Sequence, residues 1–337
     1  MSQLSRQAKQ LLSLGVGTAV TIALLAWVLQ DMRWADVGRS LGRSHWGWLA
    51  LGWATYVISY GVRSQRWGTL LSEQGYSSTW KQRLTALFIG FGANSVLPAS
   101  LGEGVRAGML HRTASVPIEA SIGSIVAERM LDVGMVIVLL VLPLSTGAVP
   151  AISAFNFAWI AGGCLGLLLL WGACIVGARH PQHTVARLAP LWRMIKRPRL
   201  AERIQTGLLH FLQGLRALSL PRYWPLLLLQ TFCAWGLNGL TYWMGLLAFE
   251  IDAPGLVGAL FIQSGAALAI ALPSTPGYIG PFEASLRLLL GLYHISPATI
   301  LSYAIAMRIL MYVTIPIMAL IIAVGLGIVS QPQKLRL

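Results

Sequence analysis

The sequence predicts an all-α polytopic membrane protein with about six full transmembrane helices and two re-entrant helical hairpins in an inverted-topology repeat. Three observations support this fold class. Of the 337 residues, 56% are hydrophobic and 11% are charged, whereas charged residues make up about a quarter of a soluble domain. Long apolar windows recur along the whole chain, and two of them are interrupted by prolines and glycines. We therefore expect one integral membrane domain over residues 1–337.

The first apolar run covers residues 11–29 and follows two basic residues, Arg6 and Lys9. A signal peptide begins in the same way, but this run is long and ends in the polar stretch 30–33, without a small-residue cleavage site. We interpret 11–29 as an uncleaved first span.

Five further windows approach the roughly 20 apolar residues that a membrane-spanning helix needs. The first of them contains Trp46, Trp48 and Trp53 near its start, which is typical of an aromatic belt at a membrane interface. The last is long enough to tilt or to protrude. The five windows are 46–62, 122–142, 155–178, 223–249 and 298–329.

Two apolar segments, 84–110 and 255–292, are each interrupted near the middle. Proline removes a backbone donor and blocks the preceding helical turn. In lipid, such a break is tolerated only where it is buried in protein or lines a watery cavity. We expect each segment to be a re-entrant hairpin of two half-helices. The expected hinge residues are Pro98, Gly102, Pro273, Pro276, Gly277 and Gly280.

Loop charges predict the orientation of the chain. Basic residues accumulate in 63–83 and in 179–222, which the positive-inside rule places in the cytoplasm, together with both termini. The mixed charge of 30–45 fits least well. In this topology the first repeat, 46–142, mirrors the second repeat, 223–329. Within the basic linker, residues 200–217 form either an amphipathic helix on the inner surface or a purely topogenic segment.

Ionisable side chains inside these spans cost about 2.5–3.5 kcal/mol each on insertion scales, so they indicate function or specific pairing. Helical spacing places Glu128 and Asp132 on one face and allows Arg129 to pair with Asp132. Glu283 and Arg287 have the same favourable spacing. Arg308 has no local acid, so it needs a partner from another element or an anion of a ligand.

A guanidinium group suits phosphate because its planar fork bonds two oxygens at once. The alternative is that these charges are structural ion pairs, and Asn94 is equally compatible with a hairpin cap. His180 and His183 have metal-like spacing but no third ligand nearby. The sequence also contains no GxSxG, HExxH or Gly-rich nucleotide-binding motif, and we expect no metal, cofactor or catalytic residue. The candidate substrate-binding residues are Asn94, Glu103, Arg106, Glu128, Arg129, Asp132, Ser274, Thr275, Glu283 and Arg308.

These motifs, in this order, resemble the lysylphosphatidylglycerol synthase transmembrane-region family. The resemblance rests on Pro98-x-x-x-Gly-Glu-x-x-Arg106, Glu128-Arg-x-x-Asp132, the motif from Pro273 to Glu283, and Arg308. It implies a membrane domain that moves a lipid between leaflets. Lysyl transfer, which a separate soluble domain performs in two-part members, is not implied. Many members have an arginine around the first tip, where this chain reads Ala-Ser-Leu over 99–101.

The leading hypothesis is a lipid flippase that moves an anionic, aminoacylated or glycosylated lipid through a polar cavity between the hairpins. The alternatives are a membrane-embedded enzyme acting on lipid phosphate, a small-solute secondary transporter, and a non-catalytic partner of a lipid-modifying enzyme. We expect a membrane lipid as substrate and no nucleic acid, because the basic residues cluster between apolar segments. Whether the chain forms a homo-oligomer is left open. The expected location is a bacterial cytoplasmic (inner) membrane.

Overall fold

A computed structural model describes residues 21–30, 33–96, 101–145, 149, 157–188, 198–271 and 276–326. Every regular element in this part of the chain is a helix, so the predicted all-α fold class is confirmed. The number of full spans and the re-entrant character of the hairpins stay predictions.

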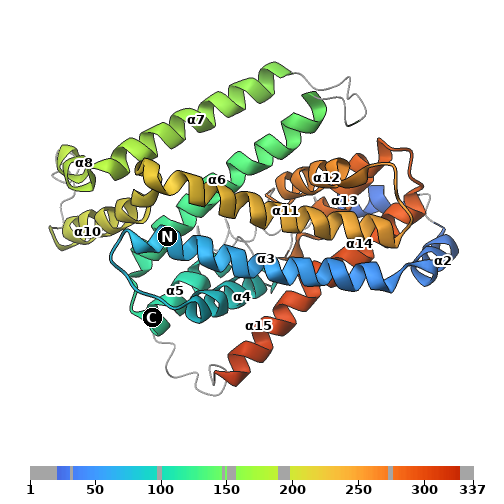
Figure 1. The fold of residues 1–337 in the computed structure, drawn as a ribbon, viewed down its shortest axis with the longest axis horizontal. Coiled ribbons are helices and arrows are strands. Elements are labelled where there is room, and N and C mark those ends of the chain that lie inside the picture. Colours follow the sequence, from blue (N-terminus) through green and yellow to red (C-terminus); the bar gives the residue numbers. More distant parts are fainter. Residues whose placement is uncertain are drawn as a thin grey trace, which may run out of the picture.

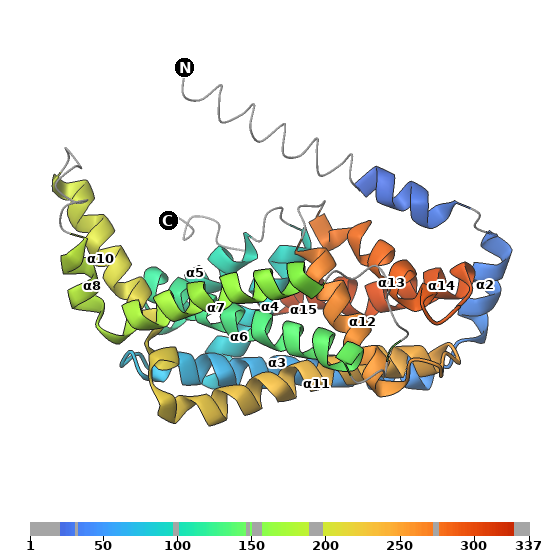
Figure 2. The same cartoon turned by 90° about the horizontal axis from the view of Figure 1, so that it is seen from above.

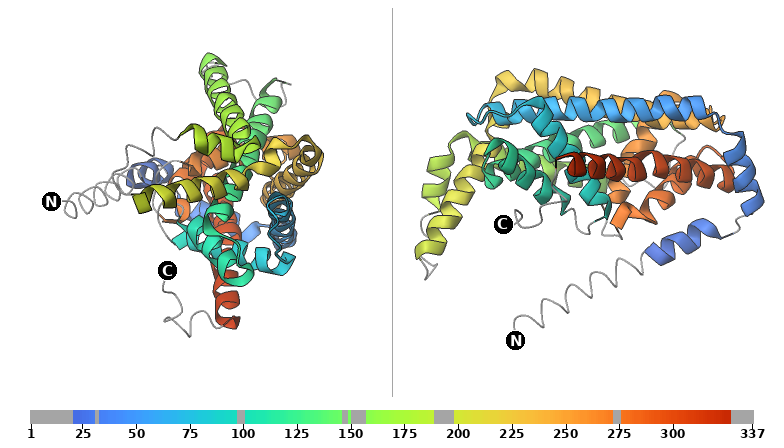
Figure 3. Two further views of the ribbon diagram at one scale, coloured as in Figure 1. Left: turned by 90° about the vertical axis from the view of Figure 1, so that its left-hand side faces the viewer. Right: turned by 90° about the horizontal axis from the view of Figure 1, so that it is seen from below.

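Two long antiparallel helices, α3 (Trp46–Ser72) and α11 (Trp224–Ala248), lie side by side along the long axis of the molecule (Figures 1 and 3). At one end, the backbone N–H of His45 donates to Ala248 O at 2.9 Å. At the other end, the hydroxyl of Tyr223 donates to the Glu73 carboxylate at 2.6 Å. A helix of 27 residues, the length of α3, extends about 40 Å at ~1.5 Å per residue, enough to cross a bilayer with its interfaces.

Each of the two interrupted segments forms a pair of antiparallel helices. In the first pair, Gly90 and Gly102 approach so closely that a Cβ on Gly102 would lie 2.0 Å from Gly90 O. In the second pair, a Cβ on Gly265 would lie 2.6 Å from the Leu289 side chain. The pairs are α4 (Trp80–Val96) with α5 (Gly102–Ala114), and α12 (Gly255–Ile270) with α13 (Pro281–Gly291), the short helix η3 (Pro276–Tyr278) preceding α13.

The glycines among the expected hinge residues are needed for two different reasons. Gly277 has φ +75° and Gly280 has φ +97°, a region that L side chains rarely adopt. Gly102 instead permits the close helix crossing just described. Pro98, Pro273, Ser274 and Thr275 lie outside the described residues.

A long helix follows each broken pair: α6 (Ile118–Ser145) after the first, and α14 (Pro297–Arg308) with its continuation after the second. The continuation consists of a π-helical turn, η4 (Ile309–Val313), and α15 (Thr314–Gly325). Within the described residues, this composite helix is the one stretch long and apolar enough to cross a membrane by itself. The order of long helix, broken pair and long helix thus occurs twice.

The remaining helices lie at the two ends of this body. Residues 30–45, expected to be a loop, contain α2 (Trp34–Arg43), which packs on α14 through a bond from Ser302 Oγ to Val37 O. At the opposite end lie α8 (Pro181–Arg187) and α10 (Pro198–Gly214), and α7 (Phe157–Arg179) runs from there toward the middle of the molecule (Figure 2). The helix expected over 200–217 is α10, and it packs on α6, where a Cβ on Gly123 would meet Phe211 O at 2.3 Å.

Candidate functional site

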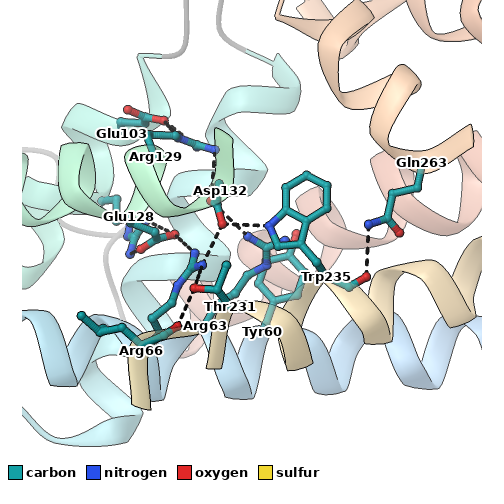
Figure 4. A network of polar contacts seen from close by, with 12 residues as sticks. Tyr60, Arg63, Arg66, Glu103, Glu128, Arg129, Asp132, Thr231, Trp235 and Gln263 are labelled. Carbon is teal, nitrogen blue, oxygen red and sulfur yellow. Dashed lines mark hydrogen bonds and ion pairs between the residues drawn. The ribbon is translucent and has the colours of Figure 1, made fainter. Parts of the chain in front are cut away.

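Charged side chains from α3, α5 and α6 meet in the interior (Figure 4). Arg66 is fully buried, and its Nη1 donates to Asp132 Oδ1 at 2.7 Å and to Thr231 Oγ1 at 3.0 Å. The same carboxylate oxygen accepts a bond of 2.9 Å from Trp235 Nε1. We call this the buried charge cluster; its ionised members are Arg63, Arg66, Arg106, Glu128 and Asp132.

Arg106 and Glu128 form the second half of the buried charge cluster. Both terminal nitrogens of Arg106 donate to the Glu128 carboxylate, at 2.6 and 3.3 Å. The Arg106 guanidinium also lies 3.9 Å from the centroid of the Trp67 ring. The side chains of Arg106 and Glu128 are 2% and 1% exposed. Arg66 joins the halves, with Nη2 at 3.4 Å from Glu128 Oε1. Charges buried this deeply are stable only as a paired network.

A more accessible ion pair borders this cluster. Arg129 Nε donates to Glu103 Oε1 at 2.8 Å, and the two side chains are 41% and 31% exposed. The predicted pairing of Arg129 with Asp132 is only a long contact of 4.0 Å. Glu103 is the closer partner of Arg129, and Asp132 Oδ2, the oxygen nearest to Arg129, accepts no hydrogen bond.

The second hairpin has an ion pair of its own. Arg308 Nε donates to Glu283 Oε1 at 2.5 Å, and Arg308 Nη1 donates to Gly277 O at 2.7 Å. The other oxygen of Glu283 accepts the backbone N–H of Gly280 at 2.8 Å, which caps the start of α13. The Arg308 guanidinium also lies 5.4 Å from the Phe282 ring and 5.5 Å from the Tyr312 ring.

The predicted pairing of Glu283 with Arg287 is wrong. Arg287 turns the other way, donates to the carbonyl of Trp27 and covers the Trp27 ring at 4.8 Å. Helical spacing permits the local pair, but Glu283 is occupied by Arg308 and by the Gly280 amide. The tertiary partner therefore replaces the local one.

The two accessible pairs occupy corresponding positions relative to the two broken helix pairs. Glu103 and Arg129 are 26 residues apart, and Glu283 and Arg308 are 25 apart. Each glutamate lies in the first turn of the second helix of a broken pair, and each arginine lies on the following long helix. We call them the first and second tip pairs.

Both tip pairs reach the last turns of α4. The Arg129 guanidinium lies 5.9 Å from the Phe91 ring. A Cβ on Gly277, whose carbonyl binds Arg308, would lie 3.5 Å from Ser95 O. The tip of the second hairpin therefore contacts the end of the first helix of the other hairpin.

Of the remaining candidates, Asn94 is buried and its Oδ1 accepts the backbone N–H of Gly102 at 2.7 Å. It caps the start of α5. Ser274 and Thr275 lie in the stretch 272–275, outside the described residues. Across the described part of the chain, no group of three or more His, Cys, Asp or Glu residues could hold a metal ion.

The sequence prediction missed Arg63 and Arg66, which it assigned to a basic cytoplasmic loop. The structure extends α3 to Ser72 and buries both arginines. A signal for this was present in the sequence: Tyr60 and Trp67 continue the helical spacing of α3 past residue 62, and Arg63 lies on the same helical face between them. Thr231 and Trp235, one turn apart on α11, were also missed.

The sequence matches the family model described as the lysylphosphatidylglycerol synthase TM region over residues 11–320. The chain belongs to this family. Membership confirms the resemblance and identifies a membrane protein with transmembrane helices. Two proteins are similar to this chain. The UPF0104 membrane protein MJ1078 of Methanocaldococcus jannaschii is 26% identical over 247 residues, covering 72% of this chain and 97% of that protein.

The second relative is the glycosyltransferase AglD of Haloferax volcanii, 25% identical over 317 residues. The alignment covers 86% of this chain and 50% of that protein. The chain therefore corresponds to about half of this relative, and the name of the whole relative describes a longer protein.

Proposed function

We propose that this chain moves the headgroup of an anionic, aminoacylated or glycosylated lipid between the leaflets of a cytoplasmic membrane. The family is named for the membrane region of a lipid synthase, which supports a role in membrane-lipid metabolism. Transport rather than synthesis is our inference from the geometry of the tip pairs. On this proposal the lipid crosses the membrane without covalent change.

The observation that carries the proposal is the recurrence of a partly accessible carboxylate–arginine pair at each helix break. Arg308 is 20% exposed and Arg129 is 41% exposed, so an approaching anion can reach both. A lipid phosphate competes with the carboxylate for the arginine, because each can present two oxygens to the planar guanidinium group. When the phosphate replaces the carboxylate as the partner of the arginine, that tip pair opens and the headgroup passes toward the other tip pair.

The buried charge cluster has a different role in this proposal. Arg66, Arg106 and Glu128 are no more than 2% exposed and already bond to one another or to Asp132. A headgroup has no access to them. They hold α3, α5 and α6 together so that the tip pairs keep their positions.

The proposal is tested with purified protein in vesicles that contain a fluorescent lipid in both leaflets. A membrane-impermeant reductant then bleaches the outer leaflet, and the bleached fraction reports translocation. We expect bleaching beyond the outer-leaflet fraction for at least one anionic or glycosylated lipid, and none in empty vesicles. Equal bleaching in protein-containing and empty vesicles for every lipid class would contradict the proposal.

A membrane-embedded enzyme is separated from a transporter in the same vesicles. Mass spectrometry of the lipids after incubation with Mg²⁺ reports any chemical change. We expect the lipid masses to stay constant while translocation proceeds. A new lipid product that depends on the protein would favour the enzyme.

A further inference from the structure

A polar pocket of about 270 Å³ lies where α2 meets the ends of α3 and α11. It is the end of the molecule opposite α8 and α10 (Figure 1). Both signs of charge line it. The lining includes Asp36, Arg39, Arg43, Ser44, Glu250 and Thr299.

An apolar groove of about 290 Å³ adjoins this pocket, between α3 and the composite helix of α14 and η4. Its floor is formed by Leu49, Ala306 and Leu310, which are 8%, 9% and 6% exposed. Its walls are the much more exposed Trp46 and Ile309, at 71% and 55%. The groove is therefore open at the surface of the molecule and has a floor of packed side chains.

The pocket and the groove are neighbours, since Ser44 lines both. Exposed tryptophans at positions 46 and 48 mark this level of the molecule as a membrane interface. A polar pocket beside an apolar groove has the pattern of polarity of one phospholipid molecule. The headgroup would occupy the pocket and one acyl chain the groove.

The charges of the pocket select the headgroup. Asp36 pairs with Arg39, and Glu250 lies 3.2 Å from His45 Nε2. Among the described residues, Arg43 has no ion-pair partner although it lines the pocket. A guanidinium without a carboxylate, beside a groove that fits an acyl chain, is suited to a phosphate diester.

We propose that this groove and pocket form a specific binding site for a phospholipid, with its phosphate diester on Arg43 and one acyl chain between Trp53 and Ile309. Ile309 and Leu310 directly follow Arg308, so the groove and the second tip pair share one stretch of helix. The π-helical turn widens the helix here, as is frequent at functional sites. That the bound lipid is the substrate for transport by the second tip pair rests on the proposed function. Binding of the lipid at this site does not rest on it.

The test uses full-length protein in vesicles containing a phosphatidylglycerol with a photoreactive diazirine in one acyl chain. After irradiation, mass spectrometry maps the labelled peptides. We expect labelling concentrated in residues 46–53 and 306–314, and little on the exposed face of α15 around Leu320 and Ile321. Labelling spread evenly over the lipid-facing helices, as for bulk lipid, would overturn the proposal.

Two variants test the groove and the phosphate contact separately. Ala50 is an exposed lining residue, so Ala50→Phe fills the groove without disturbing the core and lowers the focused labelling to background. Arg43→Gln lowers it by about tenfold, the effect of losing one charge-assisted hydrogen bond. The matched control, Arg33→Gln, changes an exposed arginine that does not line the pocket and leaves labelling intact. Ala50→Leu is the milder replacement if the phenylalanine variant does not fold.

Soluble glycerophosphoglycerol separates a lipid site from a site for free phosphate esters. We expect it not to compete with the labelled lipid, because it lacks the acyl chain that fills the groove. Competition at equal concentration would contradict a lipid site. Focused labelling in protein that shows no translocation would refute the proposed function and leave this binding site standing.

Discussion

The buried charge cluster and the second tip pair use the same side chains, arginine and carboxylate, in different surroundings. In the cluster, five ionised groups bond across three helices, and Arg66 is fully buried. In the second tip pair, one glutamate and one arginine bond each other, a backbone amide and a backbone carbonyl. Arg308 retains 20% exposure there. The difference teaches that buried charges in these helices can fix helices together, and that a more exposed pair remains accessible to the exchangeable anion that the proposed function requires.

The largest expected effect is on the cluster. Arg66→Ala leaves Asp132 and Glu128 partly unpaired in the interior, which costs about 3–5 kcal/mol. We expect a large fall in melting temperature in detergent, or loss of folded protein on gel filtration. The matched variant, Arg129→Ala, removes an arginine from a partly exposed pair and costs about 0–1 kcal/mol. Equal losses in the two variants would contradict the division of roles.

A smaller effect is expected at the first hairpin. Gly102→Ala places a Cβ 2.0 Å from Gly90 O, and backbone atoms cannot rotate away. We expect a loss of about 1–3 kcal/mol, as for overpacking, measured by thermal unfolding. Gly104→Ala is the control on the same helix, since a Cβ there has no neighbour within 4 Å. It should stabilise α5 by up to about 1 kcal/mol.

The sequence was sufficient for the fold class, the two breaks and the residues that flank them. Proline and glycine inside apolar windows are local signals, so the breaks within 84–110 and 255–292 could be located without tertiary information. The pairing of the charges was not local. Arg63 and Arg66 look like loop residues because basic residues commonly follow a span, and their carboxylate partners lie far along the chain on α6.

Local spacing also misassigned the partner of Glu283. The i,i+4 rule selects Arg287, whereas the folded chain brings Arg308 from the next helix to both Glu283 and the Gly277 carbonyl. Tertiary geometry decides between two arginines that sequence spacing cannot rank. Asn94 is the opposite case: a hairpin cap was one of its two predicted roles, and its side chain accepts the backbone N–H of Gly102.

The smallest expected effect is at the end of α3, outside the hydrophobic segments. The pKa of the Glu73 carboxyl is lowered below its usual value. The main cause is the hydrogen bond from the Tyr223 hydroxyl, and the nearby Arg222 lowers the pKa further. A folded-state pKa below the unfolded one means that this contribution to stability is present above the unfolded pKa. It is lost as the pH falls through the folded pKa.

Glu73→Gln should therefore lower the melting temperature slightly at pH 7, and the difference from the wild type should shrink at acid pH. Thermal unfolding at several pH values measures this. Arg222 is two-thirds exposed, so the effect is that of a surface pair. A gap that widened on acidification would contradict the assignment.

The most direct test of the central claim is lipid translocation by Arg308→Gln in the vesicle assay, compared with the wild type and with Arg287→Gln. Arg287 is on the same hairpin but outside the tip pair. The account predicts that Arg308→Gln loses most translocation while remaining folded, that Arg308→Lys recovers part of it, and that Arg287→Gln is close to wild type. Translocation by folded Arg308→Gln at the wild-type rate would contradict the account.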